Sequence, residues 1–214
     1  MPGMQTPSEN EIIKKYGVSN TTARKVLSEL ESLGYATRIK GKGTFVRSRY
    51  VDKTVTRILG FSNNMRQSGF VPSTKLLHTK LIKSGYSMTI SGRFYAIKGP
   101  VLQIHRLRLA NNVPIMLEWR FISLKLCPGI EKMNLQTSLY DIYEKNYDLK
   151  LTQVDQMLSV LPNLNPNILN LFELNENTPS FLLTGATFCG KGTILEMEES
   201  IFRGDKYSFS VKAT

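Results

Sequence analysis

The feature that most constrains the fold is a pair of short helical patterns, joined by a glycine turn and followed at once by a hairpin pattern. Pro7-Ser8-Glu9 is typical of a helix start, because a serine can cap the free amides and an acidic residue suits the first turn. Gly17 ends this helix, and Ser19 or Asn20 begins the second one. Two short helices joined by a tight turn that contains glycine predict a helix-turn-helix.

The second helix carries an apolar stripe whose members are three and four residues apart. They are Ala23, Val26, Leu27, Leu30 and Leu33. We expect Gly34 to close the helix as its C-terminal cap. Tyr35–Ile39 and Thr44–Ser48 then alternate around the basic tip Lys40-Gly41-Lys42-Gly43, which predicts a hairpin. A helix-turn-helix followed directly by a hairpin is a winged helix.

The opposite face of the second helix is polar and basic. It carries Asn20, Thr21, Arg24, Lys25 and Ser28. Such side chains suit base edges and phosphates of the major groove, although a solvated helix face looks the same. The basic tip favours DNA binding, because its glycines let the backbone approach a phosphate or the minor groove. The net charge of +11 agrees, with nine Lys and Arg against four Glu in residues 1–50.

The rest of the chain predicts a second domain. Residues 49–57 are polar without strong periodicity, so we expect a linker between a first domain at 1–48 and a second at 58–214. Helices are predicted near 62–68, 137–147 and 166–173, and strands at 74–83, 101–110, 113–123, 151–161, 180–190, 193–203 and 206–212. Asn111-Asn112 predicts a hairpin turn. The fold class is therefore α+β, with a mostly antiparallel sheet.

Several classes of protein are disfavoured. Apolar residues make up 41% of the chain, enough for a core, and no apolar run approaches the roughly 20 residues of a membrane helix. No secretory signal is recognisable, and Cys127 and Cys189 do not form a CxxC pair, so we expect free thiols, a cytoplasmic location and no membrane partner. The only histidines are His78 and His105, without metal-ligand spacing or a nucleophile motif. We therefore expect no catalytic residue, no metal and no cofactor.

The second domain holds one candidate anion site. Arg106 and Arg108 are two residues apart in a predicted strand and share a face, where two guanidiniums can grip a phosphate or a carboxylate. Solvated or salt-bridged arginines are the alternative. We expect His105 to point to the other face as a packing residue, and Glu198 and Glu199 to be surface charges.

Pro7 to Val46 resembles the DNA-binding domain of the GntR family. The resemblance rests on Pro7-Ser8-Glu9, Val18-Ser19, Thr22-Ala23-Arg24 and the wing Gly41-Lys42-Gly43-Thr44-Phe45-Val46. It implies that the DNA contacts are Ser8, Asn10, Ser19, Asn20, Thr21, Arg24, Lys40, Lys42 and Gly43.

Two departures from the family pattern stand out. Family members often have arginine at the positions of Asn10 and Asn20; asparagine reads adenine whereas arginine favours guanine, so we expect an unusual operator or weaker binding. Only MPGMQT precedes Pro7, so we expect the usual first helix of the family domain to be missing.

About residues 56–212 resemble the UTRA effector domain of the HutC subfamily, on HRLRLANNVPIMLEWRFI, SLYDIY and EMEESIFRGDKYSF. This resemblance implies a fold like that of chorismate lyase, with an antiparallel sheet flanked by helices. The implied effector contacts are Arg106, Arg108, Glu118, Ser138, Tyr140, Glu196 and Tyr207. Phe202 stands where many relatives have tyrosine, and the following Arg203-Gly204-Asp205 is expected to fix a turn.

The resemblance implies a homodimeric transcription repressor that a small molecule, above all a phosphorylated sugar, releases from double-stranded operator DNA. The alternative is an effector-binding protein of the same family with impaired or lost DNA binding. An enzyme with the chorismate-lyase fold is disfavoured, since a shared fold does not carry an activity with it.

Overall fold

The computed structural model describes residues 4–33, 35–46, 51–54, 60–190 and 192–210. The chain divides into two compact units, Met1–Val51 and Asp52–Thr214. Some predictions lie outside the described residues: the cap at Gly34 and the ends of the strands predicted to reach residues 48 and 212. None of the described helices is long and apolar enough to span a membrane.

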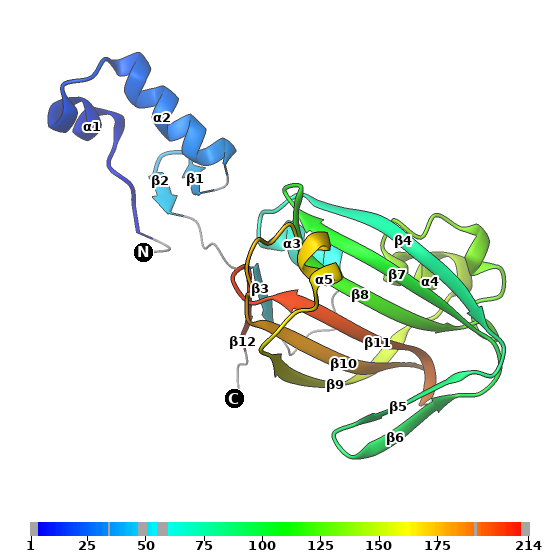
Figure 1. Ribbon diagram of the computed structural model, residues 1–214. Helices are drawn as coiled ribbons and strands as arrows, with labels where there is room; N and C mark the ends of the chain where they lie inside the picture. Colours follow the sequence, from blue (N-terminus) through cyan, green and yellow to red (C-terminus); the bar gives the residue numbers. More distant parts are fainter. Residues whose placement is uncertain (1–3, 34, 47–50, 55–59, 191, 211–214) are drawn as a thin grey trace. The chain divides into compact units, whose positions relative to one another are not determined.

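Unit 1 contains the predicted winged helix-turn-helix. Helices α1 (Glu9–Tyr16) and α2 (Asn20–Ser32) are followed by the antiparallel strands β1 (Ala36–Ile39) and β2 (Gly43–Val46) (Figure 1). Ser8 begins α1 with a capping box, in which its hydroxyl accepts from the Glu11 amide while the Glu11 carboxylate accepts from the Ser8 amide. Gly17 ends α1 in the left-handed region at φ 66°.

Two additional contacts complete unit 1. Ala23 and Leu27 of α2 are buried together with Ala36 of β1, so the helix packs on the hairpin. Residues 4–6 lie along the outer edge of β2: the Thr6 amide donates to the Thr44 carbonyl at 2.7 Å, and the Val46 amide donates to the Met4 carbonyl at 2.7 Å. The wing therefore has a third extended segment.

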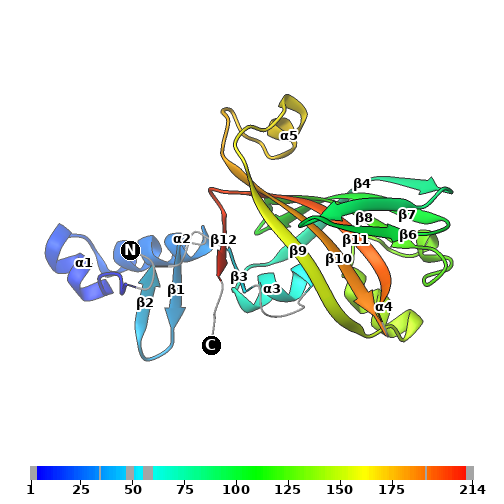
Figure 2. The ribbon, with the colours of Figure 1, turned by 90° about the horizontal axis from the view of Figure 1, so that it is seen from below.

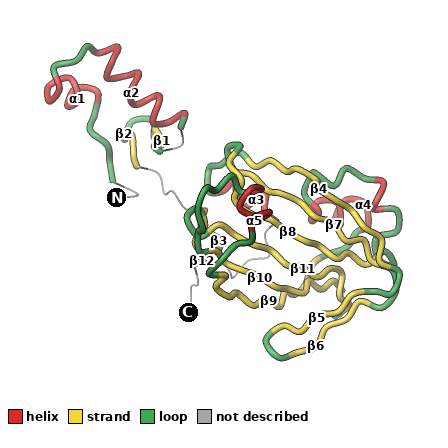
Figure 3. Tube along the Cα trace, viewed as in Figure 1, coloured by secondary structure: helices red, strands yellow, loops and turns green. Residues whose placement is uncertain are grey.

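Unit 2 is built on a six-stranded antiparallel sheet. Its strands, in spatial order, are β4 (Pro72–Ile82), β7 (Val101–Ala110), β8 (Val113–Ser123), β11 (Thr193–Arg203), β10 (Ser180–Cys189) and β9 (Leu151–Leu161). The helices are α3 (Phe61–Gln67), α4 (Leu139–Tyr147), α5 (Pro166–Leu171) and the 3-10 turn η1 (Ile130–Lys132) (Figure 3). Asn111 and Asn112 have φ of 49° and 63°, which fits the predicted hairpin turn between β7 and β8.

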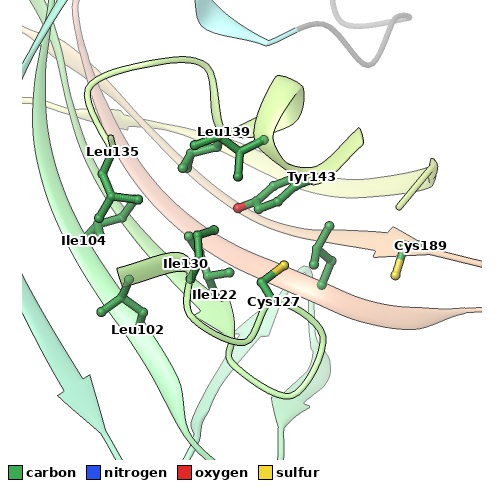
Figure 4. Close-up of a cluster of buried hydrophobic side chains, with 11 residues drawn as sticks. Leu102, Ile104, Ile122, Cys127, Ile130, Leu135, Leu139, Tyr143 and Cys189 are labelled. Carbon is green, nitrogen blue, oxygen red and sulfur yellow. The ribbon is translucent and has the colours of Figure 1, made fainter. Parts of the chain in front are cut away.

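The two faces of this sheet are covered by different elements. On the first face, Leu102, Ile104 and Ile122 pack against α4, whose Tyr143 points from the helix toward the strands (Figure 4). On the second face, Leu107 and Ile201 pack against α5. Figure 2 shows α4 and α5 on opposite sides of the sheet. We call these the α4 face and the α5 face.

Beside α5, this face of the sheet has a hollow of about 510 Å³. Its lining includes Trp119 and Phe121. The ring of His105 stacks on that of Trp119 with centroids 4.4 Å apart. This arrangement confirms the prediction that His105 packs on the face opposite Arg106.

Two parts of the sequence interpretation were wrong or incomplete. The hairpin of β5 (Tyr86–Ile90) and β6 (Arg93–Ile97) was not predicted, although Ser91-Gly92 between two alternating runs is a hairpin signal. The predicted linker 49–57 contains a strand, β3 (Val51–Thr54), which pairs with β12 (Tyr207–Ser210). The partner of β3 is more than 150 residues away in the chain, and local periodicity cannot reveal such a pairing.

Candidate functional site

In unit 1, the predicted DNA contacts fall into two groups. The side chains of Asn10, Asn20, Thr21, Arg24, Lys40 and Lys42 are exposed. Ser8 and Ser19 use their hydroxyls as helix caps, Ser19 accepting from the Thr22 amide at 3.2 Å. Gly43 has φ 116°, and a Cβ there would collide with the side chain of Gln5. The six side chains of the first group point to solvent, while Ser8, Ser19 and Gly43 shape the backbone that presents them.

One carboxylate joins three elements of unit 1. Oε1 of Glu9, in the first turn of α1, accepts from Nη2 of Arg38 on β1 at 2.5 Å and lies 3.5 Å from Nε of Arg24 on α2. The Glu9 side chain is only 21% exposed, whereas those of Arg24 and Arg38 are 68% and 46% exposed. The hydrogen bond from Arg38 is the largest of the effects that lower the pKa of Glu9.

In unit 2, the α4 face carries a buried network of charges. Glu118 on β8 lies beside Arg106 and Arg108 of β7: its Oε1 pairs with Nη2 of Arg106 and accepts from Nη1 of Arg108 at 3.1 Å. Its Oε2 accepts from Nε of Arg120 at 3.1 Å. Because both arginines pair with the same oxygen of Glu118, they share a face of the sheet as predicted, and they are salt-bridged. Arg106, Arg108 and Glu118 are each at most 2% exposed.

Arg120 extends this network to two further carboxylates. Its Nη1 donates to Oε1 of Glu196 at 2.6 Å, and its Nη2 lies 2.7 Å from Oε2 of Glu198. The Tyr143 hydroxyl donates to Oε2 of Glu196 at 2.5 Å. The network thus contains three arginines and three glutamates, and its formal charges balance.

The network corrects the prediction for Glu198 and Glu199. Glu198 is 2% exposed and also accepts from Gln156 and Ser200. Glu199, on the other face, is half-buried and accepts from the Tyr86 hydroxyl at 2.6 Å. Neither is a surface charge. Since Glu196 and Glu198 are two apart in one strand, strand periodicity would have placed both on the same face. The same signal, applied to Glu118 and Arg120, would have found Arg120.

Burial and neighbouring charges both shift the pKa values of Glu118, Glu196 and Arg108. Burial raises the pKa of Glu118, but the three surrounding guanidiniums outweigh it and hold that pKa far below its usual range. Burial is also the largest effect on Glu196, and there it prevails and raises the pKa. Burial, together with the neighbouring charge of Arg106, lowers the pKa of Arg108 to about 9.

The arginines also hold the segment that leads into α4. Nη1 of Arg106 donates to the carbonyl oxygens of Leu135 and Thr137, at 2.9 and 3.2 Å. The next residue, Ser138, begins α4, and its hydroxyl accepts from the Asp141 amide. Nη2 of Arg108 donates to the Ser62 hydroxyl in the first turn of α3 at 3.3 Å.

The remaining predicted contacts lie at the edges of this region. Gly60, at the start of α3, lies beside the side chains of Ser138 and Tyr140. Burial, more than the nearby Glu196, raises the pKa of Tyr140 well above its usual range. The Tyr207 hydroxyl accepts from Nδ2 of Asn64 at 3.3 Å and is buried beside the ring of Phe202. Arg203 and Asp205 form the expected turn, with Nη2 of Arg203 2.8 Å from Oδ2 of Asp205.

Two nitrogen atoms of the network are left over. Nε of Arg106 and Nε of Arg108 are buried and have no hydrogen-bond partner among the described residues. Buried donors are normally satisfied, so two unpaired N–H groups on neighbouring guanidiniums are exceptions to that rule. No group of three or more His, Cys, Asp or Glu in the described ranges is placed to hold a metal ion.

Comparisons with known proteins match both units. Residues 1–46 match the family model described as bacterial regulatory proteins, gntR family, and residues 67–208 match that of the UTRA domain. The chain is 30% identical over 215 residues to the HTH-type transcriptional repressor NagR of Bacillus subtilis, covering 97% of this chain and 85% of that protein. It is 23% identical over 214 residues to the probable fructoselysine utilization operon transcriptional repressor of Escherichia coli K12, covering 98% and 85%.

A solved structure agrees on the fold. PhnF from Mycobacterium smegmatis superposes with a TM-score of 0.70 at 21% identity, covering 100% of this chain and 93% of that one. A winged helix-turn-helix joined to such a sheet domain defines the class of DNA-binding transcription regulators, and the chain is a regulator of this class, not an enzyme. It belongs to the GntR family and carries a UTRA domain.

Proposed function

We propose that the chain is a repressor, that two copies bind a near-palindromic operator, and that a small anionic effector in unit 2 releases them. The effector class we favour is a phosphorylated sugar. The names of the relatives support this proposal, since NagR and the fructoselysine regulator are both called repressors. The two-fold symmetry of a homodimer would match an operator with two half-sites.

The observation that carries the effector proposal is the orphaned pair of Nε atoms on Arg106 and Arg108. The Arg106 guanidinium lies close to the N-terminus of α4, where backbone amides and the helix dipole favour an anion. A phosphate offers three acceptor oxygens and about two negative charges, enough for both atoms. The carboxylates of Glu118 and Glu196 would then accept from the sugar hydroxyls.

The contacts of Arg106 suggest how such binding reaches the rest of the unit. The same guanidinium that would meet the phosphate donates to the carbonyl oxygens just before α4. A phosphate that binds Nε of Arg106 therefore pulls on the guanidinium whose Nη1 makes these two hydrogen bonds, and so shifts the start of α4. This shift releases the operator only to the extent that the effector binds the shifted arrangement more tightly.

The test measures thermal unfolding with sugar 6-phosphates, the parent sugars and inorganic phosphate, followed by operator binding with each compound that stabilises the chain. A true effector at 100 times its Kd stabilises the fold by about 2.7 kcal/mol. Arg106→Lys keeps the charge but loses the planar fork, so it should abolish the response, whereas the exposed Arg93→Lys should not. Stabilisation by parent sugars equal to that by their phosphates would refute the anionic effector. A stabilising compound that leaves operator affinity unchanged would refute release.

A further inference from the structure

The carboxylate of Glu9 organises two exposed arginines that come from different elements. Arg24 belongs to α2 and Arg38 to the wing strand β1, and both are bound to the same oxygen atom, Oε1. The guanidiniums are therefore neighbours, although they are 14 positions apart in sequence. The amide of Arg38 also donates to Oε1 of Glu31 at 3.1 Å, which fixes the backbone of β1 against α2.

The charges of this trio do not cancel. Two guanidiniums share one carboxylate, so the trio keeps a formal charge of +1, and Glu9 has only one fifth of its side chain exposed. The solvent meets the two arginines and little of the carboxylate. Each guanidinium has five N–H donors, and a shared carboxylate oxygen occupies few of them. An exposed pair of this kind is shaped to receive the oxygens of a phosphodiester.

We propose that Arg24 and Arg38 together bind one phosphate of the DNA backbone, and that Glu9 is the positioning residue that holds them side by side. This inference rests on the proposed DNA-binding function and adds Glu9 and Arg38 to its machinery. The site reads no sequence directly. It fixes the register of α2 on the duplex, because it ties the helix and the wing to one point of the backbone.

The purely structural alternative is an ion pair that only stabilises unit 1. Exposed ion pairs contribute little to stability, so a structural role alone predicts small effects of any substitution. The two roles predict changes of opposite sign in the affinity for the preferred duplex when the charge of Glu9 is removed. Removing a negative charge from a DNA-binding surface strengthens binding to any duplex through long-range electrostatics. Removing a positioning group weakens binding to the preferred sequence despite that gain.

The experiment uses the full chain and a duplex that the wild-type chain selects from a random-sequence pool, with a mixed-sequence duplex of equal length as reference. Glu9→Gln should weaken binding to the selected duplex at least threefold and strengthen binding to the mixed one. The exposed Glu29→Gln makes the same charge change on α2 and should strengthen both. Glu9→Asp keeps the carboxylate and should recover part of the loss.

The second arm measures the salt dependence of Arg38→Ala. Loss of one phosphate contact lowers the slope of log affinity against log salt by about 0.9 per bound copy. Between 50 and 200 mM salt, the wild-type affinity should therefore fall about 3.5-fold more per copy than that of the variant. Far-UV circular dichroism checks that each variant is folded.

The outcomes distinguish a failure of the proposed phosphate site from a failure of the proposed DNA-binding function. An unchanged salt slope in Arg38→Ala overturns the phosphate contact. Glu9→Gln that behaves like Glu29→Gln overturns the positioning role. In both cases the proposed function survives, because the wild-type chain binds its selected duplex. A wild-type chain that selects no sequence and binds no duplex overturns the proposed function and this site with it.

Discussion

Replacing Glu118 with glutamine tests whether the buried charges of the α4 face must balance. The wild-type network contains three arginines and three glutamates, all nearly inaccessible to solvent. Glu118→Gln leaves three buried guanidiniums with two carboxylates, and its amide group must place an N–H donor toward one of them. Breaking a buried ion pair by removing one partner costs about 3–5 kcal/mol, because an uncompensated charge stays behind. For a unit of this size, that cost lowers Tm by roughly 6–20 °C.

The assay is urea and thermal unfolding at pH 7, with the exposed Glu131→Gln as a matched control. Inorganic phosphate should restore part of the stability of Glu118→Gln and little of that of the control, since it replaces the missing negative charge. A loss below about 1 kcal/mol, or a Tm equal to that of Glu131→Gln, would refute the claim that the network depends on charge balance.

The pH dependence of the same variant gives a second prediction. The pKa of Glu118 is depressed in the folded state, so the unfolded state binds the proton first, and stability falls as the pH drops below the ordinary glutamate pKa. Glu118→Gln should therefore lose less stability than wild type between pH 5 and pH 3; equal losses would contradict this origin. Gly204→Ala should destabilise by about 1–3 kcal/mol in urea unfolding, because its Cβ would strike the carbonyl oxygen of Pro179; an unchanged midpoint would show that the backbone yields. Burial raises the pKa of the Cys127 thiol to about 12, so a thiol reagent should label it only after unfolding, and rapid labelling of the native chain would show that it is accessible.

Local signals in the sequence predicted the local structure well. The helix starts near Ser8, near Ser19 and near residues 137 and 166 were predicted, because each observed cap bonds to an amide a few residues away. The turn at Asn111-Asn112 was recognisable because asparagine tolerates the left-handed φ values that such a turn requires. The residues that specify each of these elements are therefore close to one another in the sequence.

The candidate site was predicted only in part, because its contacts are between strands. The face shared by Arg106 and Arg108 follows from strand periodicity, but the position of Glu118 between them depends on the register of β7 on β8. The Tyr143–Glu196 hydrogen bond joins a helix to a strand 53 residues away. The pairing of Arg38 with Glu9 likewise depends on how α1 packs against the wing. No pattern within a single element specifies these distances.

Glu118 and Trp119 are consecutive residues of β8, yet they serve opposite faces of the sheet. Glu118 lies in the charge network, while Trp119 lines the hollow of the α5 face. Trp119 is the only tryptophan of the chain. Trp119 is therefore an intrinsic fluorescence probe that directly follows Glu118 of the network in the sequence. An effector that moves β8 will change the indole emission from the far side of the sheet, without touching the ring, and a stopped-flow trace of that emission will time the first step of the response.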